Sequence, residues 1–374
     1  IKLKKNKIFI DTFYFQYAYS GIGTYMSELV LGLESLGSSK YEYIYSHKLT
    51  KKKNYINSNF KLLRLFFHLK YFIWKQLLLP IKLISIKPDL ILCPDYILPF
   101  FNFNTKQICV FHDAFFWDYP ENYNKYWGYY FRFLIKICLK YDATIITTSE
   151  SSKSNLSKYF SNEIKFVYQS FKPNLNDKKF KLEKFNVKKN KYILHVGSFD
   201  KRKNILTLVE AFNILKTSHN IFDIKLLLVG KQNINGSSII LNEIVDFIKK
   251  NNLKNEVILT DYLTDLDVIG LYSNALIYVF PSSDEGFGIP ILESFSNDLP
   301  VICSDIPIFK EIGANNVVYF ELEKVDELST TMSKLINSKS KKDIMIKKGR
   351  ERLKKFSRKA FVKDFENIIF QKIM

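Results

Sequence analysis

Cysteine is scarce in this 374-residue sequence, and its four positions lie far apart. Cys93, Cys109, Cys138 and Cys303 form no C-x-x-C pair and have no histidine at the spacing of a zinc site. The sequence therefore encodes no recognisable zinc motif and no disulfide framework. We expect four reduced cysteines in buried positions.

Long apolar runs are also lacking. No stretch of about 18 uncharged apolar residues occurs, which argues against a membrane-spanning helix. The sequence does not open with a charged and then apolar leader that ends in small residues. These features predict a cytoplasmic protein that reaches the inner face of a membrane only peripherally.

Signatures of two other protein classes are missing. No expected strand is followed by G-x-G-x-x-G with an acidic residue about 20 positions later, which disfavours an NAD-dependent dehydrogenase.

The formal net charge is +19, most of it before about residue 180. Such a field attracts phosphates of a nucleotide, a lipid or a nucleic acid. A basic nucleic-acid-binding protein is thus one alternative, although the basic residues form no known binding motif. Alternatively, the positive net charge reflects only a compositional bias toward lysine.

The composition is that of a globular protein, with 47% apolar and 25% charged residues. The length favours two domains. Apolar runs of strand length alternate with helix-like segments, which predicts parallel sheets covered on both faces. We expect an α/β fold with two Rossmann-like halves facing a central cleft, and the interdomain linker and its approach in the Lys/Asn-rich segment 171–191. The expected strands are 7–11, 89–93, 107–111, 143–148, 192–196, 224–229, 257–260, 276–280 and 301–303.

The densest motif lies in the second half, between residues 280 and 294. An apolar strand ends at Phe280, a loop with Gly286 and Gly288 follows, and a helix is expected to begin near Pro290. The backbone amides of Phe287, Gly288 and Ile289 would then point out of a helix N-terminus, where an anion such as a diphosphate binds readily.

Two glutamates flank this expected anion site. Glu285 lies on the loop and Glu293 about one turn inside the helix. One carboxylate could bind sugar hydroxyl groups and the other a nucleoside ribose. Alternatively, they are an ordinary loop acid and a solvated helix acid.

A second motif follows another strand, from Gly197 and Ser198 to Asn204. Here Arg202 and Lys203 are expected at the mouth of the cleft, where cations neutralise charge on a departing diphosphate. No metal would then be needed. A basic run of this kind can also be a solvated corner of the fold.

These two motifs resemble those of the family-4 retaining glycosyltransferases with the GT-B fold. Gly197–Asn204 is similar to G-(T/S)-x-x-x-R-K-N, and Glu285–Glu293 is similar to E-x7-E. The likeness also includes Gly21–Tyr25, Leu299–Ile302 and other short strings along nearly the whole chain. Relatives often carry Asn-Gly where this chain has Gln169-Ser170, and Gly where it has Asn204.

The resemblance implies roles for individual residues. Arg202 and Lys203 would bind the donor diphosphate, Glu285 would contact the transferred sugar, and Glu293 would hold the ribose. Gly197, Ser198 and the 286–289 loop would complete the donor site. The implied activity is retaining, metal-independent transfer of a hexose from a nucleotide diphosphate sugar to a glycan or lipid-linked glycan.

Further expectations follow from the same resemblance. Mannose from GDP-mannose is favoured, for surface polysaccharide such as lipopolysaccharide, with no cofactor and no nucleic acid partner. An epimerase or a phosphorylase on the same fold is the rival enzyme. The expected domains are an acceptor-binding domain, 1–172, and a nucleotide-sugar-binding domain, 173–356. A C-terminal helix, 357–374, would return to the first domain.

The first half offers weaker candidates. Gly21 and Gly23 are expected in an acceptor or phosphate loop before a helix that starts at Thr24, although a plain turn would look the same. His112 and Asp113 follow a strand and are expected at the ligand-binding end of the sheet. By resemblance His112 lines the sugar pocket; otherwise it is a structural histidine.

Residues 60–87 form a basic, aromatic, helical stretch. It is either a core helix of the first domain or a patch that docks on an anionic membrane surface.

Overall fold

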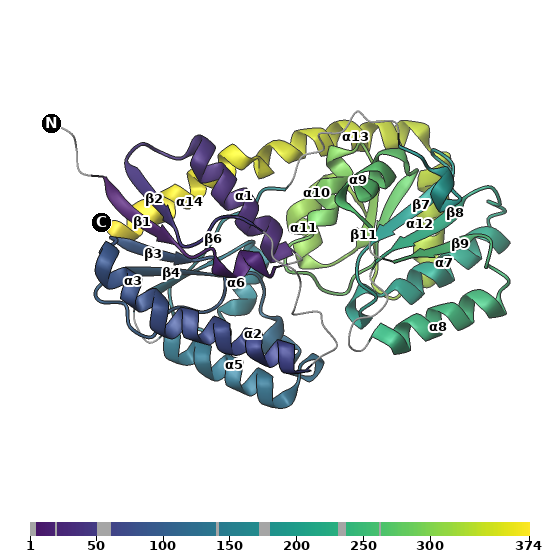
Figure 1. The fold of residues 1–374 in the computed structure, drawn as a ribbon. Helices are drawn as coiled ribbons and strands as arrows, with labels where there is room; N and C mark the ends of the chain where they lie inside the picture. Colours follow the sequence, from purple (N-terminus) through teal and green to yellow (C-terminus); the bar gives the residue numbers. More distant parts are fainter. Residues whose placement is uncertain are drawn as a thin grey trace. The chain divides into compact units, whose positions relative to one another are not determined.

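The computed structural model describes residues 5–18, 21–50, 61–139, 142–171, 180–230, 237–261 and 263–374. Contacts divide the chain into two compact units, each an α/β structure of its own (Figure 1). Unit 1 comprises Ile1–Phe171 and Phe356–Met374, and unit 2 comprises Lys172–Lys355.

Unit 1 is built on a six-stranded sheet whose strands all pair in parallel, in the order β2-β1-β3-β4-β5-β6. The strands are β1 (Asn6–Ile10), β2 (Tyr41–Tyr45), β3 (Leu90–Cys93), β4 (Lys106–Phe111), β5 (Ala143–Thr147) and β6 (Ile164–Phe166). The chain adds β2 on one side of β1 and β3 on the other. The direction of winding therefore reverses between β1 and β3.

Both faces of this sheet are buried, as its nearly continuous apolar strands predict. In β3, Leu90 and Leu92 pack with residues of the first and last helices of the unit, such as Tyr25 and Phe361. The intervening Ile91 packs on the opposite face. Successive side chains of a strand point to opposite faces, so one strand serves two cores.

The helices of unit 1 are α1 (Gly21–Leu36), α2 (Lys61–Ile73), α3 (Leu79–Ile86), α4 (Phe115–Asp118), α5 (Lys125–Cys138), α6 (Glu150–Leu156) and α14 (Arg358–Ile373). The C-terminal α14 packs against α1 (Figure 1). Arg358 donates from Nε and Nη2 to the two carboxylate oxygens of the buried Glu28, each at 2.9 Å. This bidentate pair fixes the start of α14 on unit 1.

A π-helical turn, Trp74–Leu78, connects α2 with α3 without a break. The helix ends where Lys87 adopts a left-handed conformation, with φ 50°, and its amide bonds to the Leu83 carbonyl. The predicted helical stretch is confirmed from residue 61; residue 60 lies outside the described part, as do the side chains of residues 61–64.

Unit 2 has a second parallel six-stranded sheet, in the order β12-β11-β10-β7-β8-β9. Its strands are β7 (Tyr192–Val196), β8 (Lys225–Val229), β9 (Val257–Thr260), β10 (Ile277–Phe280), β11 (Val301–Ser304) and β12 (Val318–Phe320). The chain runs outward from β7 through β8 to β9, and then from β10 through β11 to β12. Winding therefore reverses between β7 and β10.

The helices of unit 2 are α7 (Ile205–Thr217), α8 (Ser237–Lys250), α9 (Asp265–Asn274), α10 (Ile289–Ser296), α11 (Pro307–Gly313), α12 (Val325–Asn337) and α13 (Lys339–Leu353). Within the segment predicted as the linker and its approach, residues 180–191 belong to unit 2, where a 3-10 turn, Glu183–Phe185, lies and the apolar side chains of Phe185 and Val187 are buried. Residues 172–179 of that linker lie outside the described part.

The α/β fold and the strands predicted from sequence are confirmed, as are four free, buried cysteines. Three strands were not predicted, namely β2, β6 and β12. No helix among the described residues is both long and apolar enough to cross a bilayer.

Candidate functional site

The two sequence motifs of unit 2 come together at the reversal of its sheet. Strands β7 and β10 are neighbours. The loop after β7 carries Arg202 and Lys203, and the loop after β10 carries Glu285. Because ligands of open α/β sheets bind beyond the carboxyl ends of the strands at such a reversal, this is the expected ligand position of unit 2.

Glu285 is held by three side chains. Its carboxylate forms an ion pair with the Lys203 ammonium, and its Oε2 lies 3.1 Å from Arg202 Nη1. The Ser282 hydroxyl donates to Oε1 at 2.9 Å. Ser282 was not predicted as a site residue, although its place three positions before Glu285 on a tight loop is a signal that could have been used.

The charges of this cluster shift one another's proton affinities. Burial raises the pKa of Glu285, but attraction to Lys203 and Arg202 outweighs it, and the net pKa is lowered. Burial also disfavours the charged form of Lys203; the Glu285 carboxylate offsets only part of this, and the pKa of Lys203 is lowered. Two cations thus share one buried carboxylate, so the cluster is suited to bind a second anion.

Backbone contacts hold the two loops together. The Ser283 amide donates to the Arg202 carbonyl at 2.7 Å, and Arg202 Nη1 donates to the Asp284 carbonyl at 2.9 Å. The motif residues therefore form one rigid patch instead of two independent corners.

Helix α10 begins beside this patch as predicted. Gly288 precedes its first turn with φ 100°, a left-handed conformation that favours glycine, and Pro290 lies in the first turn. Because Gly288 has no side chain, the N-cap position provides no side-chain hydrogen bond to the first backbone amides of α10. The amide of Ile289 thus lies at the positive end of the helix, as an anion site requires.

Glu293 lies inside α10, near the hydroxyl of Tyr272. Burial raises the pKa of Glu293 to about 7, and the neighbouring Tyr272 side chain lowers this pKa only in part. This carboxyl group therefore changes charge near neutral pH. Tyr272, from α9, was not predicted as a partner.

The loop after β7 requires close backbone approach. A Cβ on Gly230, after β8, would lie 1.7 Å from the Gly197 carbonyl oxygen. The Gly197 amide bonds to the Val229 carbonyl at 2.9 Å, and the Ser198 hydroxyl donates to Asp200 at 2.5 Å. A Cβ on Gly197 would also lie 3.8 Å from Lys203 Cε, so this predicted donor-binding residue lies next to the Lys203–Glu285 pair.

His195 is a further candidate that sequence reasoning did not single out. It is fully buried at the end of β7, and its Nδ1 lies 3.0 Å from the Val279 carbonyl oxygen. Burial lowers its pKa to about 4, so the ring is neutral at neutral pH. Nε2 has no hydrogen-bond partner within the described residues and would lie 3.2 Å from a Cβ on Gly197.

The backbone conformation of residue 204 explains why this chain can have Asn204 where relatives often have Gly. Its backbone is left-handed, with φ 51°, directly before α7. Glycine and asparagine are the residues that adopt this conformation most easily. Either residue therefore suits the position after Lys203.

In unit 1, His112 follows β4 as predicted. Its Nε2 lies 3.1 Å from the Pro94 carbonyl oxygen and therefore donates to it. Burial lowers the pKa of His112 to about 4, despite this hydrogen bond. The ring is thus neutral at neutral pH and carries its lone pair on Nδ1.

Asp113 lies in the loop between β4 and α4. Asp113 Oδ1 accepts from the Tyr96 hydroxyl at 3.2 Å and from the Phe115 amide at 3.1 Å.

The loop predicted for Gly21 and Gly23 is wrong, because α1 already begins at Gly21. A Cβ on Gly23 would lie 3.0 Å from the Ala18 carbonyl oxygen, so a close backbone approach is confirmed there.

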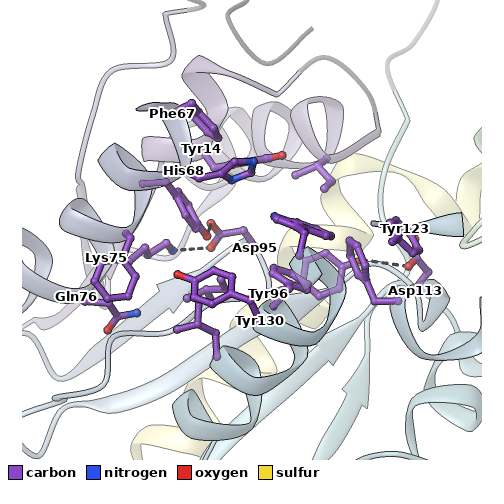
Figure 2. Close-up of a pocket in the computed structure, with 18 residues that line it drawn as sticks. Tyr14, Phe67, His68, Lys75, Gln76, Asp95, Tyr96, Asp113, Tyr123 and Tyr130 are labelled. Carbon is purple, nitrogen blue, oxygen red and sulfur yellow. Dashed lines mark hydrogen bonds and ion pairs between the residues drawn. The ribbon is translucent and has the colours of Figure 1, made fainter. Parts of the chain in front are cut away.

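One buried acidic cluster could suggest a metal. Ligand atoms of Asp11, Cys93 and Asp95 lie within 4.8 Å of one another. However, Lys75 Nζ lies 2.7 Å from Asp11 Oδ2. It also lies 2.6 Å from Asp95 Oδ1 (Figure 2). An internal ammonium group therefore occupies the place of a cation.

In a comparison with known protein families, a family model matches most of unit 2. Residues 177–352 match the family model described as glycosyl transferases group 1. The range includes the Arg202, Lys203, Glu285 and Glu293 motifs.

Among curated proteins, the chain is 31% identical over 217 residues to the O-antigen chain mannosyltransferase RfbU of Salmonella typhimurium, covering 57% of this chain and 56% of that protein. It is 27% identical over 176 residues to the O-antigen chain mannosyltransferase B of Escherichia coli, covering 47% and 45%. The chain thus spans about half the length of these relatives.

Solved structures share the fold over the whole chain. A glycosyltransferase from Rickettsia africae has a TM-score of 0.71 at 19% identity and covers 99% of both chains. The Anabaena protein HepE, crystallised with UDP-glucose, has a TM-score of 0.71 at 14% identity and covers 98% of this chain and 99% of its own.

Proposed function

We propose, on the premise that the chain belongs through residues 177–352 to the glycosyl transferases group 1, that it transfers a hexose from a nucleotide diphosphate sugar to a glycan or lipid-linked glycan. The observation that carries this proposal is the cluster of Lys203, Arg202 and Glu285 at the reversal of the unit 2 sheet. Two cations and the start of α10 converge there, which suits a pyrophosphate.

The proposed reaction retains the configuration of the anomeric carbon. The bond between that carbon and the diphosphate oxygen breaks as the acceptor oxygen bonds to the same face of the sugar. The acceptor proton passes to a diphosphate oxygen. Lys203, Arg202 and the start of α10 stabilise the charge that grows on the leaving group.

The other candidates take supporting roles in this scheme. Glu285 binds hydroxyl groups of the transferred sugar, and Glu293 binds the ribose. His112 binds sugar as a neutral hydrogen-bond acceptor, because its pKa of about 4 leaves it uncharged. The two cations make a metal unnecessary, so we propose metal-independent transfer.

We propose mannose from GDP-mannose as the donor, in the synthesis of a surface polysaccharide. The support is the likeness to two proteins that are named as O-antigen chain mannosyltransferases. A thermal-shift screen with nucleotide sugars tests this, because a bound donor raises the melting temperature. GDP-mannose should give the largest shift.

A different outcome of this screen would change the proposal. A larger shift with a UDP- or dTDP-sugar would overturn the choice of donor but keep the transfer. No shift with any nucleotide sugar would overturn the transfer itself. Donor converted to an isomer without any acceptor would point to an epimerase.

We further propose that unit 1 docks on an anionic membrane surface, at the cytoplasmic face, through α2 and α3. No acidic residue occurs from position 43 to 88. Apolar side chains on these helices and on the π-helical turn between them are more than half exposed, namely Leu65, Phe66, Leu69, Leu77 and Ile81. Basic residues beside an exposed apolar face are typical of helices that lie in a lipid interface.

Vesicle flotation tests the membrane proposal. The protein should float with phosphatidylglycerol vesicles and less with phosphatidylcholine vesicles. Phe66→Ser should weaken flotation, whereas the control Phe222→Ser should not. Phe66 is 65% exposed in α2 and Phe222 is 66% exposed in unit 2, so the pair differs in place and not in exposure. Equal flotation with both lipids would contradict the proposal.

A further inference from the structure

One buried side chain near the Lys203–Glu285 pair takes no part in the reaction proposed above, namely His195 of β7. Its Nδ1 lies 3.0 Å from the Val279 carbonyl oxygen on the neighbouring strand β10. A carbonyl oxygen only accepts hydrogen bonds, so Nδ1 carries the ring proton and Nε2 carries a lone pair. Burial lowers the pKa of the ring to about 4, and His195 therefore keeps this neutral form at neutral pH.

The lone pair on Nε2 is an unused hydrogen-bond acceptor in the interior of unit 2. Nε2 is buried and has no hydrogen-bond partner within the described parts of the chain. The ring is nevertheless fixed, because it lies nearly parallel to Tyr278, with centroids 6.1 Å apart and planes inclined by 14°. A buried acceptor without a donor lowers stability, whereas an apolar ring of similar shape would not. Its presence therefore indicates a role in binding or catalysis.

The lone pair lies on the side of Gly197 that also faces Lys203. A Cβ on Gly197 would lie 3.2 Å from His195 Nε2 and 3.8 Å from Lys203 Cε. The two side chains thus border the space that glycine leaves open. They also share a neighbour, because Lys203 Nζ lies 5.5 Å and the His195 ring 6.3 Å from the centroid of the Phe280 ring. Besides burial, the positive charge of Lys203 contributes to the low pKa of His195, so the two groups interact electrostatically.

Lys203 needs hydrogen-bond acceptors to remain charged in this setting. Burial lowers its pKa, and the Glu285 carboxylate offsets only part of that effect. In the proposed reaction Glu285 also accepts from hydroxyl groups of the transferred sugar, so Lys203 has to share this carboxylate. A further carboxylate beside Lys203 would repel the diphosphate. A neutral imidazole accepts an N–H without adding negative charge, and therefore leaves the positive charge of Lys203 available to the donor.

We propose that His195 is a positioning residue for Lys203: with the donor bound, Nε2 accepts a hydrogen bond from the Lys203 ammonium group and directs this cation toward the diphosphate. His195 does not contact the donor itself, because it is fully buried. The alternative is a purely structural role, in which only the hydrogen bond from Nδ1 to Val279 matters. The assignment rests on the proposed transfer function and adds a residue that acts through Lys203.

Two substitutions of His195 separate the roles of its ring nitrogens. His195→Asn keeps an N–H donor near the position of Nδ1 but removes the acceptor at Nε2. His195→Gln keeps an acceptor near Nε2 but removes the donor at Nδ1. We expect the kcat of His195→Asn to fall about tenfold, the effect of losing one hydrogen bond to a charged group. The KM for the donor should change little, because the diphosphate carries most charge while the bond breaks. His195→Gln should keep most of the activity.

The control is His219→Asn, in the loop between α7 and β8, which should match wild type. Turnover is measured as nucleoside diphosphate released from the nucleotide sugar that gives the largest thermal shift, with circular dichroism to verify folding. A structural role predicts the opposite order, in which His195→Asn is active and His195→Gln is impaired. That order would overturn the proposal, as would full activity of His195→Asn.

Nitrogen NMR observes the lone pair directly and does not need turnover. The full chain is labelled with 15N-histidine, and the signals of His195 are assigned among the five histidines with His195→Gln. The signal of a ring nitrogen with a lone pair moves upfield when that lone pair accepts a hydrogen bond. Saturating GDP or UDP should therefore move the Nε2 signal upfield. If both variants are inactive or unfolded, this signal of the wild type decides.

Glu285→Gln gives the same readout without any nucleotide. This variant frees Lys203 from its ion pair, so the Nε2 signal should already lie upfield in buffer. Glu321→Gln, at an exposed position directly after β12, should leave the signal unchanged. Lys203→Met in the Glu285→Gln background should reverse the upfield shift, because no ammonium group remains.

Nucleotide binding by the same samples separates the two proposals. Wild type that binds GDP or UDP without a shift of the Nε2 signal would overturn the role of His195 and leave the transfer function intact. A shift in Glu285→Gln that survives Lys203→Met would also overturn it, because the hydrogen bond would come from another donor. Absence of any nucleotide binding would instead overturn the transfer function, while Glu285→Gln would still show whether His195 accepts from Lys203.

Discussion

Lys203 and Glu285 form an ion pair although 82 positions separate them in the chain. Each belongs to a different motif, and each was expected to contact the donor. In the structure they contact one another. A bound diphosphate would therefore compete with the Glu285 carboxylate for the Lys203 ammonium group, and the pair defines two experiments.

Removing either cation should abolish most of the activity. Lys203→Ala and Arg202→Ala should each lower kcat by about 10²–10³-fold, because each removes one electrostatic contact to the leaving group. Lys201→Ala is the matched control, since Lys201 is an exposed member of the same basic run. Sugar transfer is measured at saturating donor, with circular dichroism to verify folding. Full activity of both variants would contradict the scheme.

Neutralising Glu285 should separate nucleotide binding from catalysis. Glu285→Gln keeps the shape of the side chain but frees Lys203 and Arg202 for a phosphate. We expect the Kd of the nucleoside diphosphate to fall by up to about tenfold, equivalent to ~1.4 kcal/mol, while turnover of the nucleotide sugar falls.

Isothermal titration with GDP and UDP measures this difference. Glu321→Gln is a suitable control, because Glu321 is an exposed residue directly after β12. Weaker binding of the nucleoside diphosphate by Glu285→Gln would show that the carboxylate supports the phosphate site instead of competing with it.

The sequence predicted the charged cluster of unit 2 because its chemistry is local. Arg202 and Lys203 follow one apolar strand and Glu285 follows another, and parallel strands end at the same edge of a sheet. The pairing between these side chains could not be predicted, since it depends on how β7 and β10 lie next to each other. The same holds for Tyr272 beside Glu293, because the two come from different helices.

The missed strands have a different cause. Strands β2, β6 and β12 are all edge strands of their sheets, and all but one of the residues in each are only partly buried or exposed. β12 and β6 have three residues each. Such short, half-exposed strands lack the continuous apolar run that marks the central strands.

Glu293 should make stability depend on pH near neutrality. Burial raises its pKa in the folded state to about 7, from an ordinary value of 4.5. Between these values the folded state holds a proton that the unfolded state has lost, so stability falls as pH rises, by up to about 1.4 kcal/mol per pH unit. Glu293→Gln should remove this fall.

Denaturation of both proteins between pH 5 and 7.5 measures the effect as the difference between their slopes. Other groups titrate in both proteins and cancel. Glu351→Gln, at a mostly exposed position in α13, should leave the slope unchanged. Equal slopes for wild type and Glu293→Gln would mean that the carboxyl group is already ionised at pH 5. If the ionised group binds ribose, nucleotide affinity should also rise as the pH passes 7.

Gly21 and Gly23 should respond differently to substitution by alanine. A Cβ on Gly21 would have nothing within 4 Å, whereas a Cβ on Gly23 would lie 3.0 Å from the Ala18 carbonyl oxygen. Because both glycines lie in the first turn of α1, Gly21→Ala should be neutral or stabilise the protein by up to about 1 kcal/mol. Gly23→Ala forces backbone to move and should lower the melting temperature.

Phosphate binding adds a second readout for the same pair. If this turn contacts a phosphate, Gly21→Ala should weaken binding or raise the KM for the substrate that carries it, without loss of stability. If the turn is only structural, the KM values of Gly21→Ala should equal those of wild type, and only Gly23→Ala should differ, through its stability. A stable Gly23→Ala would contradict the close approach to Ala18 on which this prediction depends.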